Sequence, residues 1–299
     1  MKHEVIPQDA RRLTLALGGR WYGRYGTAPC PVCQPERRRD QNALTLENGR
    51  VALLAHCKKS EHDFRDILAA AGIRAGEYRR PDLSEIYRRK AENAAAAIRR
   101  AGAAKRIWAT SQPIAGTPAE AYLRSRAITC DLPDTLRFHS RCFHGPSSSE
   151  LPAMVALVSG GDSFAIHRTF LRADGSGKAG LPEGDKMMLG SVSGGAVMLS
   201  DGPADRLVIA EGIESGLSLL CGLLTEPMIV GAALSANGMR KLHLPKGSGH
   251  IKIATDGDPA GREAAKALAT RAHGLGWKVS ILDAGDGRDF NDILKGVAA

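Results

Sequence analysis

The sequence predicts an α+β protein whose last third is an α/β domain built on a parallel sheet. Three observations predict this fold class. After residue 205, buried strands alternate with helices, as in a parallel sheet covered on both faces. Residues 110–204 contain strands and a helix without that alternation, as in a mixed α+β subdomain, and residues 1–78 carry a cysteine and histidine cluster typical of a zinc-ribbon-like module. Residues 79–109 are predicted to be a basic helical linker.

Composition places the chain among ordinary globular proteins. Of its 299 residues, 43% are hydrophobic and 24% are charged, which excludes a disordered chain and fits two or three domains. No apolar run approaches the ~18–20 residues of a membrane span, so no membrane segment is expected. The first residues lack the apolar core of a signal peptide, so we expect a cytoplasmic protein with reduced thiols.

Charge is divided unevenly along the chain. Residues 1–106 hold 22 basic and 12 acidic side chains, a net of +10, whereas residues 107–299 hold 19 and 20, a net of −1. A basic region of this kind favours polyanions or an anionic membrane surface. Aromatic residues make up only 5% of the chain, which argues against single-strand binding by many stacked rings.

Four side chains in residues 1–78 have the types and spacing of a zinc site. Cys30-Pro31-Val32-Cys33 places two thiolates on one tight knuckle, and Cys57 and His62 follow after 23 intervening residues. Sets of four thiolate and imidazole ligands suit tetrahedral Zn²⁺. Because the second knuckle is irregularly spaced, His56 competes with His62 as the fourth ligand. Three other cysteines lack such spacing and are expected to be packing residues: Cys130, Cys142 and Cys221.

The zinc ligands lie on either side of a predicted hairpin. Its strands are expected at 42–46 and 50–54 around an Asn-Gly turn at 47–49, and residues 64–72 are predicted to form a short helix that ends at glycine. Residues 82–106 are predicted to form one long helix, opened by a capping box of Asp82 and Glu85. Its recurring basic pairs indicate either a solvated surface helix or a connector near nucleic acid.

Residues 110–204 contain a predicted helix and several strands. Thr117-Pro118-Ala119-Glu120 begins the helix with a cap, a first-turn proline and a glutamate at the third position. Residues 152–172 are predicted to form two strands around a turn at 159–162. The glycine-rich segment 173–204 is expected to be a loop, apart from a short strand at 196–199.

Acidic residues follow the strands of residues 205–299. Strands are predicted at 206–210, 228–233, 251–254 and 277–282, and helices at 213–224, 259–274 and 290–297. Glu211 follows the first strand, Asp256 and Asp258 the third, and Asp289 the last. Functional groups gather at the carboxyl ends of parallel strands, so we expect these four to converge, and Glu214, Asn291 and Asp292 are near enough to join them.

Crowded carboxylates repel one another unless cations occupy the site. Hard oxygen ligands suit Mg²⁺ or Mn²⁺, and paired divalent metals are the usual apparatus for displacement at phosphorus. The sequence therefore predicts a metal-dependent phosphoryl-transfer site. Each acid also has a structural alternative, because Asp258 and Asp289 are placed to cap helices and Glu211 to be a loop acid.

These motifs resemble a Toprim domain, the fold shared by bacterial-type primases, topoisomerases and some nucleases. Residues 210–215 carry the Glu-Gly pair after the first strand, and residues 255–262 carry the Asp-x-Asp pair after the third. Gly261-Arg262 resembles the primase version. Residues 165–171 with 186–190 resemble the basic-lined segment before Toprim in bacterial replicative primases. A zinc module in front of Toprim also matches primase order, in particular that of phages and other mobile elements.

Two positions depart from the primase pattern. Many primases place an aspartate four residues after the first glutamate, where this chain has Ser215, with Glu214 one residue earlier. The late Asp-x-Asp pair is replaced by Asp289-Phe290-Asn291-Asp292. The number of metals and the outer ligands are therefore left open.

The resemblance implies a DNA primase that synthesises short RNA primers on single-stranded DNA from ribonucleoside triphosphates. Asp256, Asp258 and Asp289 would then hold Mg²⁺, and Glu211 would be a further ligand or the general base. Three basic residues would contact triphosphate or template: Arg168, Lys186 and Arg262. Five in the zinc module would contact template phosphates: Arg37, Arg38, Arg39, Lys58 and Lys59. A replicative helicase is a further partner that this implies.

Two other functions fit the same motifs. A Toprim nuclease, or another phosphoryl-transfer enzyme of a mobile element, would use the same carboxylates to activate water. A non-catalytic nucleic-acid-binding module of a replication complex would show steeply salt-dependent binding without metal-dependent chemistry.

Overall fold

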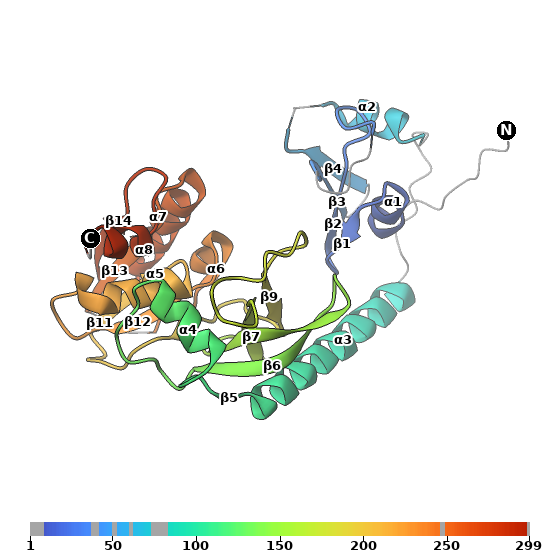
Figure 1. Ribbon diagram of the computed structural model, residues 1–299. Coiled ribbons are helices and arrows are strands. Elements are labelled where there is room, and N and C mark those ends of the chain that lie inside the picture. The colour runs from blue at the N-terminus through green and yellow to red at the C-terminus, as the bar shows by residue number, and fades with distance from the viewer. Residues whose placement is uncertain are drawn as a thin grey trace. The chain divides into compact units, whose positions relative to one another are not determined.

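The computed structural model describes residues 9–36, 42–49, 53–59, 62–72, 83–245 and 249–297. The chain divides into two compact units, Met1–Ala96 and Ala97–Ala299 (Figure 1). The boundaries predicted at 78, 109 and 204 stay predictions. Mixed α and β elements occupy both units, as the predicted fold class requires.

The first unit contains a small antiparallel sheet, which one short helix precedes in the sequence and another follows. Its strands are β1 (Arg20–Trp21), β2 (Tyr25–Ala28), β3 (Leu44–Asn48) and β4 (Leu53–Cys57), paired in that order. Its short helices are α1 (Ala10–Ala16) and α2 (Phe64–Ala70). The core is a single cluster that includes Leu13, Leu44, Leu46 and Ile67. A core this small stabilises little by itself.

The predicted hairpin is present with a shifted register. β3 continues through Asn48, which pairs with Leu53, so Glu47 and Asn48 belong to the strand and not to the turn. The Asn48 side chain accepts a hydrogen bond from the backbone of Ala10 at 2.9 Å, which gives it a tertiary role that a turn residue would lack. Residues 50–52 of the predicted second strand lie outside the described residues. The helix predicted over 64–72 is α2, which ends at Ala70, two residues before Gly72, whose φ of +77° favours glycine.

The predicted long helix is α3 (Leu83–Thr110), which ends four residues later than expected. The described side chains from Ser84 to Asn93 are exposed, as a solvated surface helix requires. Its last turns are buried on one face, where Ala104 packs with Cys142, Val155 and Phe170. The capping box of Asp82 and Glu85 lies outside the described side chains.

The second unit contains a middle sheet and a C-terminal sheet. The middle sheet is antiparallel throughout and consists of β5 (Gln112–Pro113), β6 (Leu136–His144), β7 (Ser149–Val158), β8 (Ala165–Phe170) and β9 (Lys186–Leu189) in that order. The helix predicted at Thr117 is α4 (Pro118–Ser125). β7 and β8 confirm the two predicted strands, whereas β6 was not predicted and β9 lies in the segment expected to be a loop. That expectation was wrong for Lys186–Leu189.

The C-terminal sheet has the parallel topology that the sequence predicts. Its order is β10-β12-β11-β13-β14, where all neighbours are parallel except β10. The strands are β10 (Val197–Met198), β11 (Arg206–Ala210), β12 (Ile229–Ala232), β13 (His250–Thr255) and β14 (Lys278–Asp283). The helices are α5 (Ile213–Ser218), α6 (Ala236–Lys241), α7 (Pro259–Gly274) and α8 (Phe290–Val297).

Two departures from prediction occur in this sheet's connections. The helix expected over 213–224 ends its regular part at Ser218 and continues as a π-helical segment, η1 (Leu219–Leu223). Gly222 in that segment has a φ of +109°, which regular helix does not allow. α6 was not predicted, because its Asn237-Gly238 pair is typical of a turn; Ser235 caps it by accepting from the backbone of Gly238.

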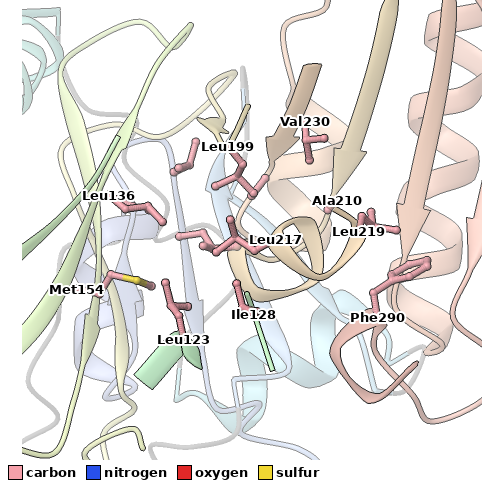
Figure 2. Packing of buried hydrophobic residues seen from close by; sticks show 14 of the residues in the cluster. Leu123, Ile128, Leu136, Met154, Leu199, Ala210, Leu217, Leu219, Val230 and Phe290 are labelled. Atoms are coloured by element: carbon pink, nitrogen blue, oxygen red, sulfur yellow. The ribbon is translucent and has the colours of Figure 1, made fainter. Parts of the chain in front are cut away.

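Helices cover both faces of the C-terminal sheet. Leu207 and Ile209 face the cluster that contains α6 and α7, while Val208 and Ala210 face the cluster that contains α5 and α8. The second cluster also contains residues of α4 and the middle sheet. Figure 2 shows Leu136 and Met154 pointing toward Leu217 and Leu199 across this shared core. The middle and C-terminal sheets therefore fold as one unit.

Candidate functional site

Cys30, Cys33, Cys57 and His62 form a compact group in the first unit. Their ligand atoms all lie within 4.8 Å of one another. The Cys30 Sγ and His62 Nδ1 are 3.7 Å apart, as are the Cys33 and Cys57 Sγ atoms. Ligand bonds near 2.3 Å in a tetrahedron place sulfurs about 3.7 Å apart, so the group fits Zn²⁺. Within the described part of the chain, it is the one such cluster of three or more potential ligands.

The surroundings of the group support metal binding. Gln34 accepts hydrogen bonds through its side-chain oxygen from the backbone of Cys30 at 2.9 Å and of Ala43 at 3.1 Å, which fixes the first knuckle. Burial, then the neighbouring thiols of Cys57 and Cys30, raise the pKa of Cys33 to about 11. Three crowded thiols are stabilised as thiolates by a nearby cation, and Zn²⁺ would supply that charge.

The other predicted residues of this unit lie in different places. His56 is exposed on β4 opposite Thr45 and is not part of the cysteine group, whereas His62 is. Lys58 and Lys59 are exposed directly after Cys57. Arg37, Arg38 and Arg39 lie outside the described residues. Their contact with DNA stays a prediction.

The carboxyl edge of the C-terminal sheet brings Glu211 and Asp256 together. Glu211 follows β11 and Asp256 follows β13, and these strands pair in parallel with Ala210 opposite Ala254. Glu211 Oε2 is buried and has no hydrogen-bond partner. Burial, then the charges of Asp256 and Asp258, raise the pKa of Glu211. A buried, unsatisfied carboxylate oxygen beside two more acids is an environment that a cation would stabilise.

Asp256 is held in the same environment. Burial raises its pKa, the hydroxyl of Ser215 lowers it by donating to Oδ1 at 3.0 Å, and Asp289 and Asp258 raise it. Ser215 thus orients Asp256 from the position where the family pattern has an aspartate. The net shift is upward, because burial and the two neighbouring acids together outweigh Ser215 and the charge of Lys186.

Asp258 and Asp289 make the structural contacts that their positions allow. Asp258 caps α7, because its Oδ1 accepts from the backbone of Gly261 at 2.6 Å. Asp289 and Asp292 exchange backbone-to-carboxylate hydrogen bonds of 2.8 and 3.1 Å at the start of α8. Arg126 lies 3.8 Å from Asp289. The helix-capping alternative therefore holds for both residues, and their charges still act on Asp256.

A second charged group lies beside these acids, around Glu214 in the first turn of α5. Glu214 is only 5% exposed. Its carboxylate is 3.0 Å from Lys186 Nζ and 3.9 Å from Lys178 Nζ, and it accepts from the Tyr122 hydroxyl at 2.9 Å. Burial alone raises the pKa of Glu214, but Lys186 and Lys178 outweigh it and lower the value to about 2. Burial, then Lys186, lower the pKa of nearby His167 to about 4, so its imidazole is neutral at pH 7.

Arg168 and Arg262 are not part of this arrangement. On β8 and β9, Thr169 pairs with Lys186 and Arg168 pairs with Met187, so Arg168 and Lys186 point to opposite faces of the middle sheet. Arg168 is 6% exposed and donates to the carbonyl of Phe143 at 3.0 Å. Arg262 forms ion pairs with Asp283 and Asp286. Nucleotide contacts of these two arginines stay predictions.

Sequence reasoning missed Lys178, Tyr122 and His167. Lys178 lies in the glycine-rich segment, outside any regular strand, and forms an isolated bridge to Leu171. Tyr122 is 92 residues from Glu214 along the chain. No local pattern indicates such contacts.

Comparisons with known proteins agree with the last third of this description. Residues 206–298 match the family model of the Toprim domain, and residues 98–199 match a domain of unknown function (DUF7146). None of the curated proteins compared with the chain matches it significantly. The predicted resemblance to a Toprim domain is therefore confirmed, and the chain carries this domain behind a Cys₃His group.

Three of the solved structures that resemble the chain are primase domains. A DNA primase domain from Pseudomonas aeruginosa is 16% identical, with 53% of this chain and 52% of that chain covered and a TM-score of 0.32. The zinc-binding and RNA polymerase domains of the Aquifex aeolicus primase are 13% identical, with 98% and 81% covered and a TM-score of 0.39. The RNA polymerase domain of Mycobacterium tuberculosis primase DnaG is 17% identical, with 66% and 77% covered and a TM-score of 0.38.

None of the helices that the structure describes combines the length and the apolar character that a membrane span requires. α3 is long enough, but its 28 residues are rich in charge.

Proposed function

We propose that the protein is a DNA primase, which synthesises short RNA primers on single-stranded DNA from ribonucleoside triphosphates. The observation that carries the proposal is the charge pattern of the Toprim edge: Glu211 and Asp256 with raised pKa values stand beside the ammonium group of Lys186. Carboxylates next to basic groups suit a metal-bound triphosphate, because the carboxylates can bind the metal and the basic groups can bind the phosphates.

The acids of this edge are donors of the kind that a divalent metal ion prefers, although among the described residues their ligand atoms are not gathered as closely as those of the Cys₃His group. Asp256 and Asp258, with Asp289 and Glu211 beside them, would hold Mg²⁺ or Mn²⁺, and the orphaned Oε2 of Glu211 is the atom that most clearly lacks a partner. When bound, the metal would bind the triphosphate and lower the cost of deprotonating the attacking 3′-hydroxyl. With its raised pKa, Glu211 is also placed to take that proton as the general base.

Other groups of the chain would bind phosphate, orient a carboxylate and hold the template. Lys186 neutralises phosphate charge, which is largely how phosphoryl transfer is accelerated. Ser215 orients Asp256 through the hydrogen bond at 3.0 Å. The zinc module would hold the template, with Lys58 and Lys59 as exposed phosphate contacts that position the strand without determining its sequence preference. A helicase partner and a mobile-element origin rest on the sequence resemblance alone.

One assay separates synthesis from cleavage. The full chain is incubated with labelled single-stranded DNA and Mg²⁺, with and without ribonucleoside triphosphates. The proposal predicts template-dependent RNA products with nucleotides and intact DNA without them. Cleavage of the DNA in the absence of nucleotides would favour the Toprim nuclease. Salt-sensitive DNA binding with neither reaction would indicate the non-catalytic module.

A further inference from the structure

Two lysine ammonium groups share one buried carboxylate in the second unit. Glu214 Oε2 lies 3.0 Å from Lys186 Nζ, and Oε1 lies 3.9 Å from Lys178 Nζ. The Glu214 side chain is 7% exposed, whereas those of Lys186 and Lys178 are 41% and 35% exposed. The carboxylate is therefore buried in the protein, while both lysine side chains are partly exposed.

The lysine pair lies next to the predicted metal edge. Glu214 immediately precedes Ser215, whose hydroxyl donates to Asp256. The charge of Lys186 acts on both Glu211 and Asp256, lowering their pKa values against the effect of burial. A ligand that reaches these lysines is thus within reach of the metal-binding carboxylates as well.

At Glu214 the two lysines share a single buried carboxylate, and Glu211 and Asp256 are further acids on which Lys186 acts. One carboxylate faces two ammonium groups, and burial followed by repulsion from Lys186 lowers the pKa of Lys178. Asp185 and Arg126 also act on Lys178, with opposite signs. Two close ammonium groups that repel each other are best stabilised by an anion with several charged oxygens, and a phosphate chain is such an anion.

We propose that Lys178 is a second phosphate contact beside Lys186 for the incoming nucleoside triphosphate, and that Glu214 positions both ammonium groups for it. This rests on the proposed function. The template backbone offers the same phosphate oxygens, but it carries one charge per phosphate and needs no metal. Proximity to Asp256 favours the triphosphate.

Equilibrium binding to the full chain tests the assignment. The probes are a non-hydrolysable α,β-methylene analogue of ATP with Mg²⁺ and, separately, a single-stranded DNA oligonucleotide. Lys178→Met is expected to weaken triphosphate binding about tenfold, as loss of one charge-assisted contact implies, and to leave DNA binding unchanged. Lys178→Arg is expected to restore most of the affinity. Lys266→Met, an exposed lysine on α7, is the matched control and is expected to change neither.

The possible results distinguish the role of Lys178 from the proposed function of the whole protein. Wild-type affinity for the triphosphate in Lys178→Met, or an equal loss for both probes, would overturn the role of Lys178 alone. A wild-type protein that does not bind the triphosphate would overturn the proposed function and this inference together. Thermal melting checks that each variant is folded, and Lys178→Gln repeats the measurement with a polar neutral side chain.

Discussion

Glu214 is a buried carboxylate that the second unit satisfies with two lysines and a tyrosine hydroxyl. Removing a partner from such a group is costly, because the charge that remains has lost its solvation. The same contacts hold Lys178 and Lys186 beside the acidic edge. At the scale of single residues, stability and the proposed ligand contacts therefore depend on the same side chain.

Glu214→Gln is expected to change how stability depends on pH. The Glu214 pKa is about 2 in the folded protein against an ordinary 4.5, so the folded state binds fewer protons there than the unfolded chain. Its stabilisation is present above the unfolded value and is lost as pH falls from about 5 toward 2. Urea unfolding near neutral pH should show Glu214→Gln less stable by about 1–3 kcal/mol, with the difference from wild type narrowing in acid.

The matched control is Glu226→Gln, which removes an exposed ion pair with Arg206 and should cost less than about 0.5 kcal/mol. Stability curves of wild type and Glu214→Gln that run parallel over the whole acid range would show that the ion pairs of Glu214 do not stabilise the fold.

Some site residues were predictable from sequence and others were not. Glu211 and Asp256 follow short buried strands, and the carboxyl ends of parallel strands meet at one edge, so their meeting follows from local pattern. Lys178 meets Glu214 from 36 residues away through a segment with no periodicity. Arg168 and Lys186 share a sequence motif, but the two-residue repeat of strands turns Arg168 to the other face.

At the scale of elements, the turn between β13 and α7 depends on Gly257. Its N–H donates to the Arg288 carbonyl at 2.8 Å, and its own carbonyl accepts from Gly287 at 3.0 Å. A Cβ built at Gly257 would collide with the backbone carbonyl of Gly285. The close approach of these two loops places Asp256 and Asp258 next to the segment that carries Asp289.

Gly257→Ala is therefore expected to separate these loops. We expect a loss of about 1–3 kcal/mol by thermal or urea unfolding, as for overpacked sites, together with weaker Mg²⁺ binding in titration calorimetry. Gly274→Ala is the control, because a Cβ there meets no atom within 4 Å. A Gly257→Ala protein that matches Gly274→Ala in both measurements would mean that the loop contact is unimportant.

The zinc module is the other element whose order depends on one feature. Its core is a single small cluster that already includes Cys30 and Cys57. Modules of this size rarely fold without their metal. We therefore expect residues 25–70 to depend on these four side chains for their folded structure.

Chelation is expected to unfold residues 25–70 and to spare the Toprim domain. Hydrogen exchange measured by mass spectrometry should show lost protection in that segment and unchanged protection in residues 206–297. Cys33→Ser should bind less zinc by elemental analysis, whereas Cys130→Ser should bind as much as wild type. A native protein without zinc, or a segment that a chelator leaves protected, would rule out the metal site.

Elements with strong local signals were predicted closely, and elements without such signals were missed. α7 begins where Asp258 and Pro259 predict, because a cap and a first-turn proline specify a helix start. β9 is a short edge strand in which alternate side chains are exposed. Its sequence, Lys-Met-Met-Leu, does not alternate between polar and apolar residues, so no strand pattern was visible. β6 shifts register between His139 and Cys142, which breaks the two-residue repeat that would have revealed it.

At the scale of the whole molecule, charge and chemistry are divided along the chain. Residues 1–106 carry a net charge of +10 and include the Cys₃His group, which suits contact with a nucleic-acid backbone. Residues 107–299 carry −1, and their acids include Glu211 and Asp256, whose pKa values are raised first by burial and then by neighbouring acids. The division fits a protein that binds a strand with its first part and performs metal-dependent chemistry with its last.

Template-dependent ribonucleotide incorporation by Asp256→Asn tests this account most directly. Asparagine still accepts the hydrogen bond from Ser215, so circular dichroism and melting should be unchanged, while loss of the metal-binding charge should lower incorporation by about 100-fold or more. Asp131→Asn, an exposed acid outside the site, should incorporate as wild type does. Full incorporation by folded Asp256→Asn would contradict the assignment of the Toprim edge as the catalytic site.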